Sequence, residues 1–388
     1  MINTEHRADT VLSEAVDGGR LSNVVAMAAS TDEVIYSGAY GLIDSVRSIE
    51  SDSIFRIASM TKAITSVAAM QLVEEGILEL DEPVYNHLPQ IRDLGVVNGI
   101  SENSNELILS KQQSPITLRQ LLTHTAGFGY TFFEPLLSKA AQKELIPEPT
   151  ADQPPFATTP LRYQPGTRWL YGTNTEWLGV LIEQVRGQGL DQVFQERIFE
   201  PLGMADTHFQ ISAASVDRVV HPRRRNDDGS LYLEELTLEE PVFFNGGGGL
   251  FSTGPDYIRF LRALLGQGEL DGARILSPAT VGIMAASHTG NKDIGPLASQ
   301  DPAFSNHVDL YPGMNNGFGL GFFVHGEPVT GGRTAGSLFW AGIMNTYFWV
   351  DFTQGVCGVF LTQVLPFYDK DALDTLGDFE QAIYHGND

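Results

Sequence analysis

Segments with β-strand character lie near both ends of this 388-residue chain, and the sequence between them is mostly helical and loop-like. We expect strands at 24–28, 33–37 and 54–57, and again at 318–324, 345–351 and 355–363. A sheet that uses both groups of strands must bring the two ends of the chain together. We therefore predict an α/β (α+β) fold, with one antiparallel sheet built from both chain ends and flanked by helices.

Helical patterns account for most of the remaining sequence, interrupted by glycine and proline. We expect helices at 9–18, 60–76, 118–122, 175–183, 256–265 and 370–384. Residues 206–245 are polar and irregular. From this distribution we predict two subdomains, in which residues 1–80 and 206–388 form the α/β part and residues 81–205 form a mostly helical part. The active site is expected at the interface between them.

The segment Ser59-Met60-Thr61-Lys62 carries the strongest chemical signal. It places a hydroxyl and an amine three residues apart at the start of a predicted helix, on one helical face. A serine hydroxyl needs a neighbouring base before it can act as a nucleophile at neutral pH. The helix start adds free N–H groups and a partial positive charge. This S-x-x-K spacing is typical of serine acyl-transfer enzymes.

The same residues have a simpler interpretation, in which Ser59 caps a surface helix and Lys62 is solvated. The flanking sequence argues against it, because residues 54–58 and 63–72 are largely apolar. Lys62 therefore opens a helix that we expect to be buried on most of its faces. A buried lysine needs a partner or a function.

Tyr171 lies on a loop just before the predicted helix at 175–183. Alone, it would be interpreted as a packing residue. Beside a serine–lysine pair a phenol can take part in proton transfer, but lowering its pKa from about 10 to about 7 requires about 4 kcal/mol. We therefore predict a proton shared among Ser59, Lys62 and Tyr171 rather than a permanent phenolate.

Acyl transfer also needs two donors for the developing oxyanion, each worth about 3–4 kcal/mol. One donor is expected to be the backbone N–H of Ser59. We expect residues 339–343 to pass beside the serine, where Gly342 allows a close approach. The N–H of Ile343 would then be the second donor.

Ser59-x-x-Lys62, Tyr171 and Trp340-Ala341-Gly342, in this order, resemble the motifs of the family VIII carboxylesterases. Those enzymes share the fold of class C β-lactamases and serine D-peptidases. The resemblance covers most of the chain and includes the segments Leu121–Gly127, Pro201–Met204, Gly247–Thr253 and Phe348–Asp351. It implies a β-lactamase/penicillin-binding-protein-like fold, with Ser59 as the nucleophile and Lys62 and Tyr171 as its activators.

Two positions depart from the pattern of lactamases and penicillin-binding proteins. The asparagine two residues after the tyrosine is replaced by Thr173, with Asn174 one position further on. Trp340-Ala341-Gly342 stands where the β-lactamases carry Lys-Thr-Gly, whose cation receives the lactam carboxylate. Both changes remove polar groups, which favours neutral acyl esters over anionic lactams. The residues that we expect to contact substrate are Tyr130, Thr173, Asn174, Trp340, Ala341 and Gly342. Tyr130, Phe132 and Phe133 lie on a loop that we expect to border the site, and packing between subdomains is the alternative for all three.

The leading functional prediction is a serine ester hydrolase that forms an acyl-enzyme on Ser59 and uses no cofactor. Transfer of the acyl group to an alcohol or amine by the same residues is an alternative that the sequence does not separate from hydrolysis. A β-lactamase or D-peptidase with weak lactam hydrolysis is a third candidate. A non-catalytic protein of the same fold would be expected to lose Ser59, Lys62 or Tyr171, and this chain keeps all of them.

Composition narrows the expected partners to a small-molecule ester. The net charge of −24 argues against nucleic-acid binding. No run approaches the roughly 20 apolar residues that span a bilayer, and the N-terminal residues lack the apolar core of a secretory signal. We therefore expect a cytoplasmic protein without a membrane partner, and leave the oligomeric state open. The single cysteine, Cys357, is expected in the core.

Three other features have structural interpretations. His124 is expected to bond backbone in a turn rather than to form a catalytic triad, and no histidine has metal-ligand spacing, so we predict no metal. The glycine run 246–249 is expected to pass close to other atoms rather than to cradle a phosphate. The basic run Arg223-Arg224-Arg225 is expected to be solvated or to form internal ion pairs.

Overall fold

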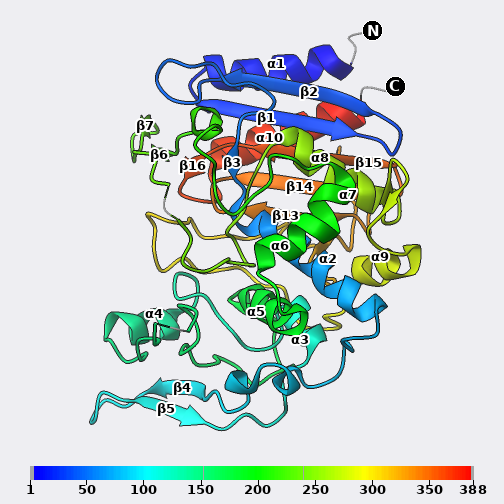
Figure 1. The fold of residues 1–388 in the computed structure, drawn as a ribbon. Coiled ribbons are helices and arrows are strands. Elements are labelled where there is room, and N and C mark those ends of the chain that lie inside the picture. The colour runs from blue at the N-terminus through cyan, green and yellow to red at the C-terminus, as the bar shows by residue number, and fades with distance from the viewer. Residues whose placement is uncertain (1–3, 152, 239, 386–388) are drawn as a thin grey trace.

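The computed structural model describes residues 4–151, 153–238 and 240–385. Figure 1 shows a sheet with helices on both faces in one half of the molecule. The other half contains α3 (Leu118–Leu122), α4 (Pro135–Gln142), α5 (Asn174–Arg186) and a hairpin of β4 (Val96–Ile100) and β5 (Leu107–Ser110).

The main sheet contains strands from both ends of the chain. Its N-terminal strands are β1 (Asn23–Ala29) and β2 (Val34–Gly41). Its C-terminal strands are β11 (Gly317–Phe318), β12 (Phe323–Val324), β13 (Leu338–Gly342), β14 (Thr346–Asp351) and β15 (Val356–Leu361). The order is β11-β12-β13-β14-β15-β1-β2, and every neighbouring pair is antiparallel. The predicted sheet is confirmed, since the β1–β15 ladder joins the two ends of the chain, but the strand expected at 54–57 lies outside it and pairs elsewhere.

Helices cover both faces of this sheet. α1 (Thr4–Asp17) and α10 (Lys370–Tyr384) lie on one face, where Phe379 packs against Tyr36 and Trp349 with ring centroids 5.5 and 6.1 Å apart. α8 (Gly254–Leu265) lies on the other face, where Tyr257 packs against Phe348 at 5.5 Å. Successive strand residues point to opposite faces. Because both faces are covered, all residues of β14 are buried, which explains its continuous apolar sequence.

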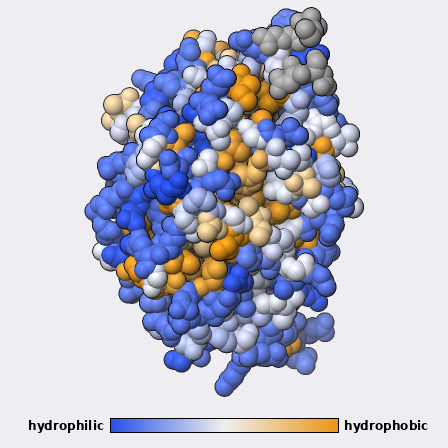
Figure 2. Space-filling model, turned by 90° about the vertical axis from the view of Figure 1, so that its right-hand side faces the viewer, coloured by the Kyte–Doolittle hydropathy of each residue, from blue (hydrophilic) through white to orange (hydrophobic). Residues whose placement is uncertain are grey.

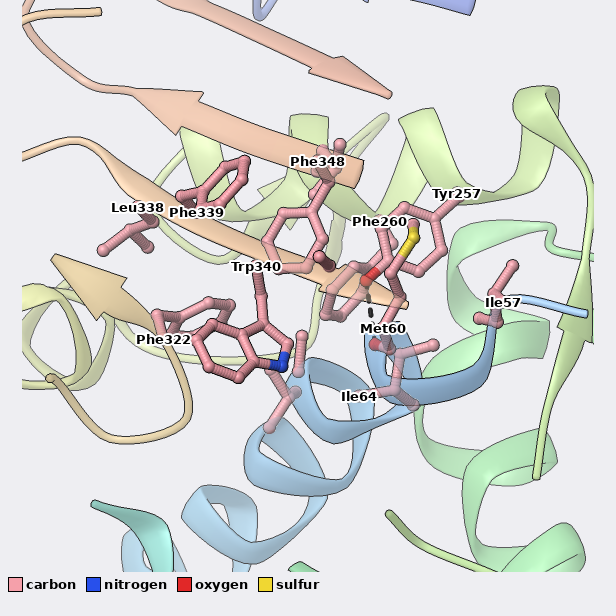
Figure 3. Packing of buried hydrophobic residues seen from close by; sticks show 14 of the residues in the cluster. Ile57, Met60, Ile64, Tyr257, Phe260, Phe322, Leu338, Phe339, Trp340 and Phe348 are labelled. Atoms are coloured by element: carbon pink, nitrogen blue, oxygen red, sulfur yellow. Dashed lines mark hydrogen bonds between the residues drawn. The ribbon is translucent and has the colours of Figure 1, made fainter. Parts of the chain in front are cut away.

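α2 (Thr61–Glu74) follows the short helix η1 (Ala58–Met60) into the protein interior. Every residue from 61 to 72 is buried, which confirms the expectation of a helix buried on most of its faces. Figure 3 shows aromatic side chains around the start of α2, among them Trp340 from β13 and Phe260 from α8. The hydroxyl of Tyr257 donates to the carbonyl of Met60 at 2.9 Å. The sheet half thereby fixes the first turn of α2.

The remaining elements are short. The helices are η2 (Val84–Asn86), η3 (Pro89–Ile91), α6 (Leu190–Phe194), the π-helical turn η4 (Gln195–Phe199), α7 (Glu200–Leu202), η5 (Val216–Arg218) and α9 (Pro278–Ala285). The strands are β3 (Phe55–Arg56) with β8 (Phe251–Ser252), β9 (Glu269–Leu270) with β10 (Ala273–Arg274), and β6 (Arg223–Arg225) with β7 (Leu231–Leu233) and β16 (Val364–Leu365).

Three details differ from the sequence-based expectation. The single strand expected at 318–324 is wrong, because a turn with Gly321 at φ +100° separates β11 from β12. The β4–β5 hairpin lies in the region expected to be mostly helical, and Ile108 and Leu109 on it are exposed, so its pattern is not that of a buried strand. The irregular segment 206–245 contains β6 and β7. α7 contacts α8 beside the sheet, so the boundary at residue 205 stays a prediction.

The surface seen in Figure 2 is mostly hydrophilic, with apolar patches between the polar residues. Within the described ranges, no helix combines the length and the apolar character needed to cross a bilayer.

Candidate active site

The turn that carries Ser59 is held by backbone from a distant part of the chain. Ile57 donates its N–H to the carbonyl of Leu250 at 3.1 Å, and the hydroxyl of Thr61 accepts from the N–H of Leu250 at 3.2 Å. Ala58 has φ +45°, a conformation that is uncommon for a residue with a Cβ. It costs about 1–3 kcal/mol and persists only where the surroundings enforce it. Ser59 is thus presented by a strained turn in η1, one turn before the regular helix.

Lys62 is buried, with 1% of its surface exposed, and its amine has three acceptors. Nζ lies 3.3 Å from Ser59 Oγ and 2.8 Å from the hydroxyl oxygen of Tyr130, and it also donates to the carbonyl of Gly247. An ammonium has three N–H donors. These oxygens give the buried amine its hydrogen-bond partners, and its burial without partners would be costly.

Tyr130 connects Lys62 to a buried carboxylate. Its hydroxyl accepts from Lys62 and donates to Oε1 of Glu176, a residue that is 4% exposed in the first turn of α5. Burial, followed by the charge of Glu176, raises the pKa of Tyr130 well above its usual range, so this phenol stays neutral. The hydroxyl predicted to contact substrate is therefore committed to two protein groups. Sequence reasoning missed Glu176, because a single carboxylate next to the apolar pair Trp177-Leu178 does not show by itself that it is buried.

Tyr171 lies beside the pair formed by Ser59 and Lys62. Its ring centroid is 5.1 Å from Lys62 Nζ and 5.0 Å from the ring of Trp340, and Tyr171 and Ser59 line the same cavity. The structure thus brings the three predicted catalytic side chains together. The tyrosine hydroxyl to which Lys62 donates is nevertheless that of Tyr130, at 2.8 Å.

The end of β13 passes against the backbone just before Ser59. A Cβ on Gly342 would lie 2.3 Å from the carbonyl oxygen of Ile57, so only glycine permits this approach. Thr346 donates its hydroxyl to the same carbonyl at 3.3 Å. Ile343, the next residue after Gly342, lines the cavity together with Ser59. This neighbourhood is consistent with the expected oxyanion donors on residues 59 and 343, which stay a prediction.

An apolar cavity opens beside Ser59. Its residues from the predicted site are Ser59, Tyr171, Trp340, Ala341 and Ile343. The others are Phe132, Phe133, Leu297, Val308, Leu310 and Phe367. Counted with its open mouth, the cavity holds about 420 Å³ of empty space, and no acidic or basic side chain lines it. Trp340 and Ala341 thus stand where a ligand can contact them, whereas Gly342 acts through close backbone packing.

The long segment 286–316 covers one side of this cavity and supplies Leu297, Val308 and Leu310. It is fixed to the loop after α3, because the N–H of Gln300 donates to the carbonyl of Phe132 at 2.9 Å. Sequence reasoning missed these wall residues, since the segment has no helical or strand period that would place its side chains.

Asn174 and His124 lie behind Tyr171 rather than in the cavity. Asn174 is fully buried, and its side-chain nitrogen lies 3.0 Å from Nδ1 of His124. Asn174 is therefore a structural residue, which corrects the expectation of substrate contact; Thr173 does not line the cavity either. Burial and the nearby charge of Lys62 lower the pKa of His124 well below its usual range, so His124 is neutral. The ring of His124 bonds the side chain of Asn174, whereas a bond to backbone was expected.

Other predicted features have clear structural outcomes. A Cβ on Gly247 would lie 2.1 Å from Cδ of Glu176, which confirms that the glycine run passes close to other atoms. Arg224 and Arg225 form ion pairs with Glu234 and Asp369, as one of the two interpretations expected. Cys357 is buried in β15, and burial raises its pKa to about 12. In the part of the chain that the structure describes, no cluster of His, Cys, Asp or Glu is arranged to hold a metal ion.

Comparison with known proteins identifies the family. A family model described as Beta-lactamase matches residues 8–383. The chain belongs to the β-lactamase family. Its fold and its assignment to the β-lactamase-like serine hydrolases are thereby confirmed, and the narrower resemblance to family VIII carboxylesterases stays a prediction.

Relatives in this family include esterases and acyltransferases by name. Lovastatin esterase of Penicillium rubens is 33% identical over 97% of this chain and 96% of its own length. Monacolin J acid methylbutanoyltransferase of Aspergillus terreus is 30% identical over 97% of this chain and 94% of its own length. The solved structure of unliganded simvastatin synthase from Aspergillus terreus matches with a TM-score of 0.81 and 27% identity over 98% of both chains.

The glycine run offers a matched test of the Lys62 environment. Gly247→Ala should destabilise the fold by about 1–3 kcal/mol through overpacking against Glu176. It should also slow labelling of Ser59 by a fluorophosphonate at least about tenfold, because Lys62 loses its carbonyl acceptor geometry. Urea unfolding and labelling rates measure both effects.

Gly248→Ala is the control, since the nearest heavy atom to its Cβ would be 3.8 Å away. It should label at close to the wild-type rate. Equal behaviour of the two variants would contradict the packing of Gly247 against Glu176.

Proposed function

We propose that this chain is a serine ester hydrolase that forms an acyl-enzyme on Ser59. The observation that carries the proposal is the buried amine of Lys62, 3.3 Å from Ser59 Oγ at the wall of an apolar cavity. A nucleophile, a base within reach and a neighbouring group that holds the base are the elements of covalent acyl transfer. The names of the relatives are compatible with ester chemistry.

In the proposed mechanism Ser59 Oγ attacks the carbonyl carbon of the ester while its proton passes to Nζ of Lys62, which reacts in its neutral form; Tyr171, which lines the same cavity as Ser59, takes part in the proton transfer. The carbonyl oxygen becomes negative and accepts from the N–H groups of residues 59 and 343. Collapse of this intermediate breaks the bond to the alkoxide, which leaves with the proton from Lys62. Water then attacks the acyl-enzyme by the same steps, which releases the acid and restores Ser59.

The cavity indicates a neutral, apolar acyl group as substrate. Its walls are aromatic and aliphatic, and the amine of Lys62 near Ser59 is already bonded to three protein oxygens. An anionic substrate would therefore lose its hydration without gaining a charged partner. This disfavours anionic lactams, so a β-lactamase or D-peptidase is the weaker candidate.

Acyl transfer to an alcohol or amine is the second candidate. The apolar walls around Ser59 favour an organic acceptor over water at the acyl-enzyme, and one relative is by name a methylbutanoyltransferase. The steps are those of hydrolysis, with the acceptor hydroxyl in place of water. Product analysis in the presence of a competing alcohol distinguishes the two.

Ser59→Ala should reduce kcat/KM for p-nitrophenyl butyrate by at least about a thousandfold, because it removes the only group that forms the acyl bond. Lys62→Met, of similar length, should reduce it by a similar factor. Purified proteins with matched circular dichroism spectra are required. Activity of Ser59→Ala within tenfold of wild type would remove the proposed function.

The charge of the acyl group should control the rate. We expect p-nitrophenyl hemisuccinate to have a kcat/KM about 10- to 100-fold lower than p-nitrophenyl butyrate, since the missing charged hydrogen bond is worth about 1.5–3 kcal/mol. The two esters share a leaving group, and their uncatalysed rates serve as the reference. Equal values for both would show that the cavity does not select neutral acyl groups.

A further inference from the structure

Glu176 is a buried carboxylate that the proposed mechanism has not used. It is 4% exposed, and its Oε1 accepts from Tyr130. Its other oxygen, Oε2, is buried without a hydrogen-bond partner among the described residues. Gly247 packs against the carboxyl group, where any larger residue would collide with it. A carboxylate kept this deep with half its acceptors unused costs stability, which points to a function.

Glu176 lies at the N-terminal end of a helix. It lies in the first turn of α5, where the free N–H groups of the helix end stabilise a negative charge. The opposite charge nearby is Lys62, joined to it through the single hydroxyl of Tyr130. Ser59, Lys62, Tyr130 and Glu176 therefore form one continuous chain of hydrogen bonds from the nucleophile to a buried anion.

We propose that Glu176 is a positioning residue that, through Tyr130, orients Lys62 and stabilises the lysine cation formed when Ser59 gives up its proton. This inference rests on the proposed function. It follows the logic of a triad, in which a third group fixes the base and offsets the charge that it acquires. The proton of Ser59 ends on Lys62 Nζ, and the protons of Tyr130 and the charge of Glu176 do not change.

Three further titratable groups lie in or beside this series of hydrogen bonds. They are Tyr130 from the loop after α3, Tyr171 from the loop before α5, and His124 from the turn at the end of α3. Tyr130 stays neutral because burial and Glu176 hold its pKa well above its usual range. His124 stays neutral because burial and Lys62 hold its pKa well below its usual range. In the proposed step, Glu176 is thus the carboxyl group that Tyr130 joins to the cation forming on Lys62.

The test is the pH dependence of kcat/KM for p-nitrophenyl butyrate in Glu176→Gln. Removing the negative charge makes protonated Lys62 less stable, so Lys62 stays neutral to lower pH. The acidic limb should therefore move to lower pH by about one unit, a typical effect of one neighbouring charge. The plateau should fall at least about tenfold, because the base is weaker. A merely structural role would lower the plateau without moving the limb.

Two further variants keep the test decisive even where Glu176→Gln folds poorly. Glu176→Asp keeps the charge, so its acidic limb should stay within about 0.3 units of wild type whatever its plateau. Tyr130→Phe breaks the hydrogen-bond link between Lys62 and Glu176. The plateau kcat/KM of the double variant Tyr130→Phe/Glu176→Gln should therefore be no more than about threefold below that of the less active single variant. The inference would be overturned if the losses in plateau kcat/KM of the two single variants multiply in the double variant. It would also be overturned if the acidic limb of Glu176→Gln stays in place or moves to higher pH.

Glu183→Gln is the matched control for loss of a carboxylate from α5. Glu183 lies seven residues, about two turns, further along α5 and accepts from the N–H of Leu190 at 2.9 Å. Its pH profile should coincide with wild type. The inference and the proposed function fail differently, because wild-type turnover and labelling of Ser59 test the function, whereas the position of the acidic limb tests Glu176.

Discussion

Burial of the Lys62 amine is the constraint on which the rest of the site depends. An amine with 1% exposure needs hydrogen-bond partners, because a buried polar group left without them typically costs about 1–3 kcal/mol. The oxygens of Ser59, Tyr130 and Gly247 meet this requirement. These three residues lie far apart in the sequence. Folding is therefore what brings their oxygens together around the amine of Lys62.

The main sheet holds the backbone around Ser59 and Lys62 in place. β1 and β15 join the chain ends, and β13 carries Trp340 and Gly342 to the turn before Ser59. From the other half of the molecule, Tyr130 and the start of α5 close over Lys62. Strain at Ala58 persists because Leu250 and the end of β13 hold the backbone of this turn. The apolar cavity beside Ser59 is lined by residues of both halves, among them Phe132 and Trp340.

Much of this arrangement could be predicted from sequence, for physical reasons. The apolar residues after Lys62 predicted that its helix is buried. The strands near both ends of the chain predicted a shared sheet. Glu176 was not predicted, because one carboxylate in an amphipathic helix is usually solvated and its depth depends on Gly247 from another segment. The cavity walls from 286–316 were not predicted, since an aperiodic segment gives no direction to its side chains. Asn174 was assigned to the substrate from motif position, whereas packing against His124 decides its orientation.

The proposed reaction forms a covalent acyl-enzyme on Ser59. Rapid-quench mass spectrometry of the intact wild-type protein, mixed with p-nitrophenyl butyrate and stopped in acid, tests this most directly. We expect a mass increase equal to one butyryl group minus a proton, mapped by peptide sequencing to Ser59. Turnover at a measurable rate with no such adduct under conditions that saturate the enzyme, or an adduct on another residue, would contradict the account.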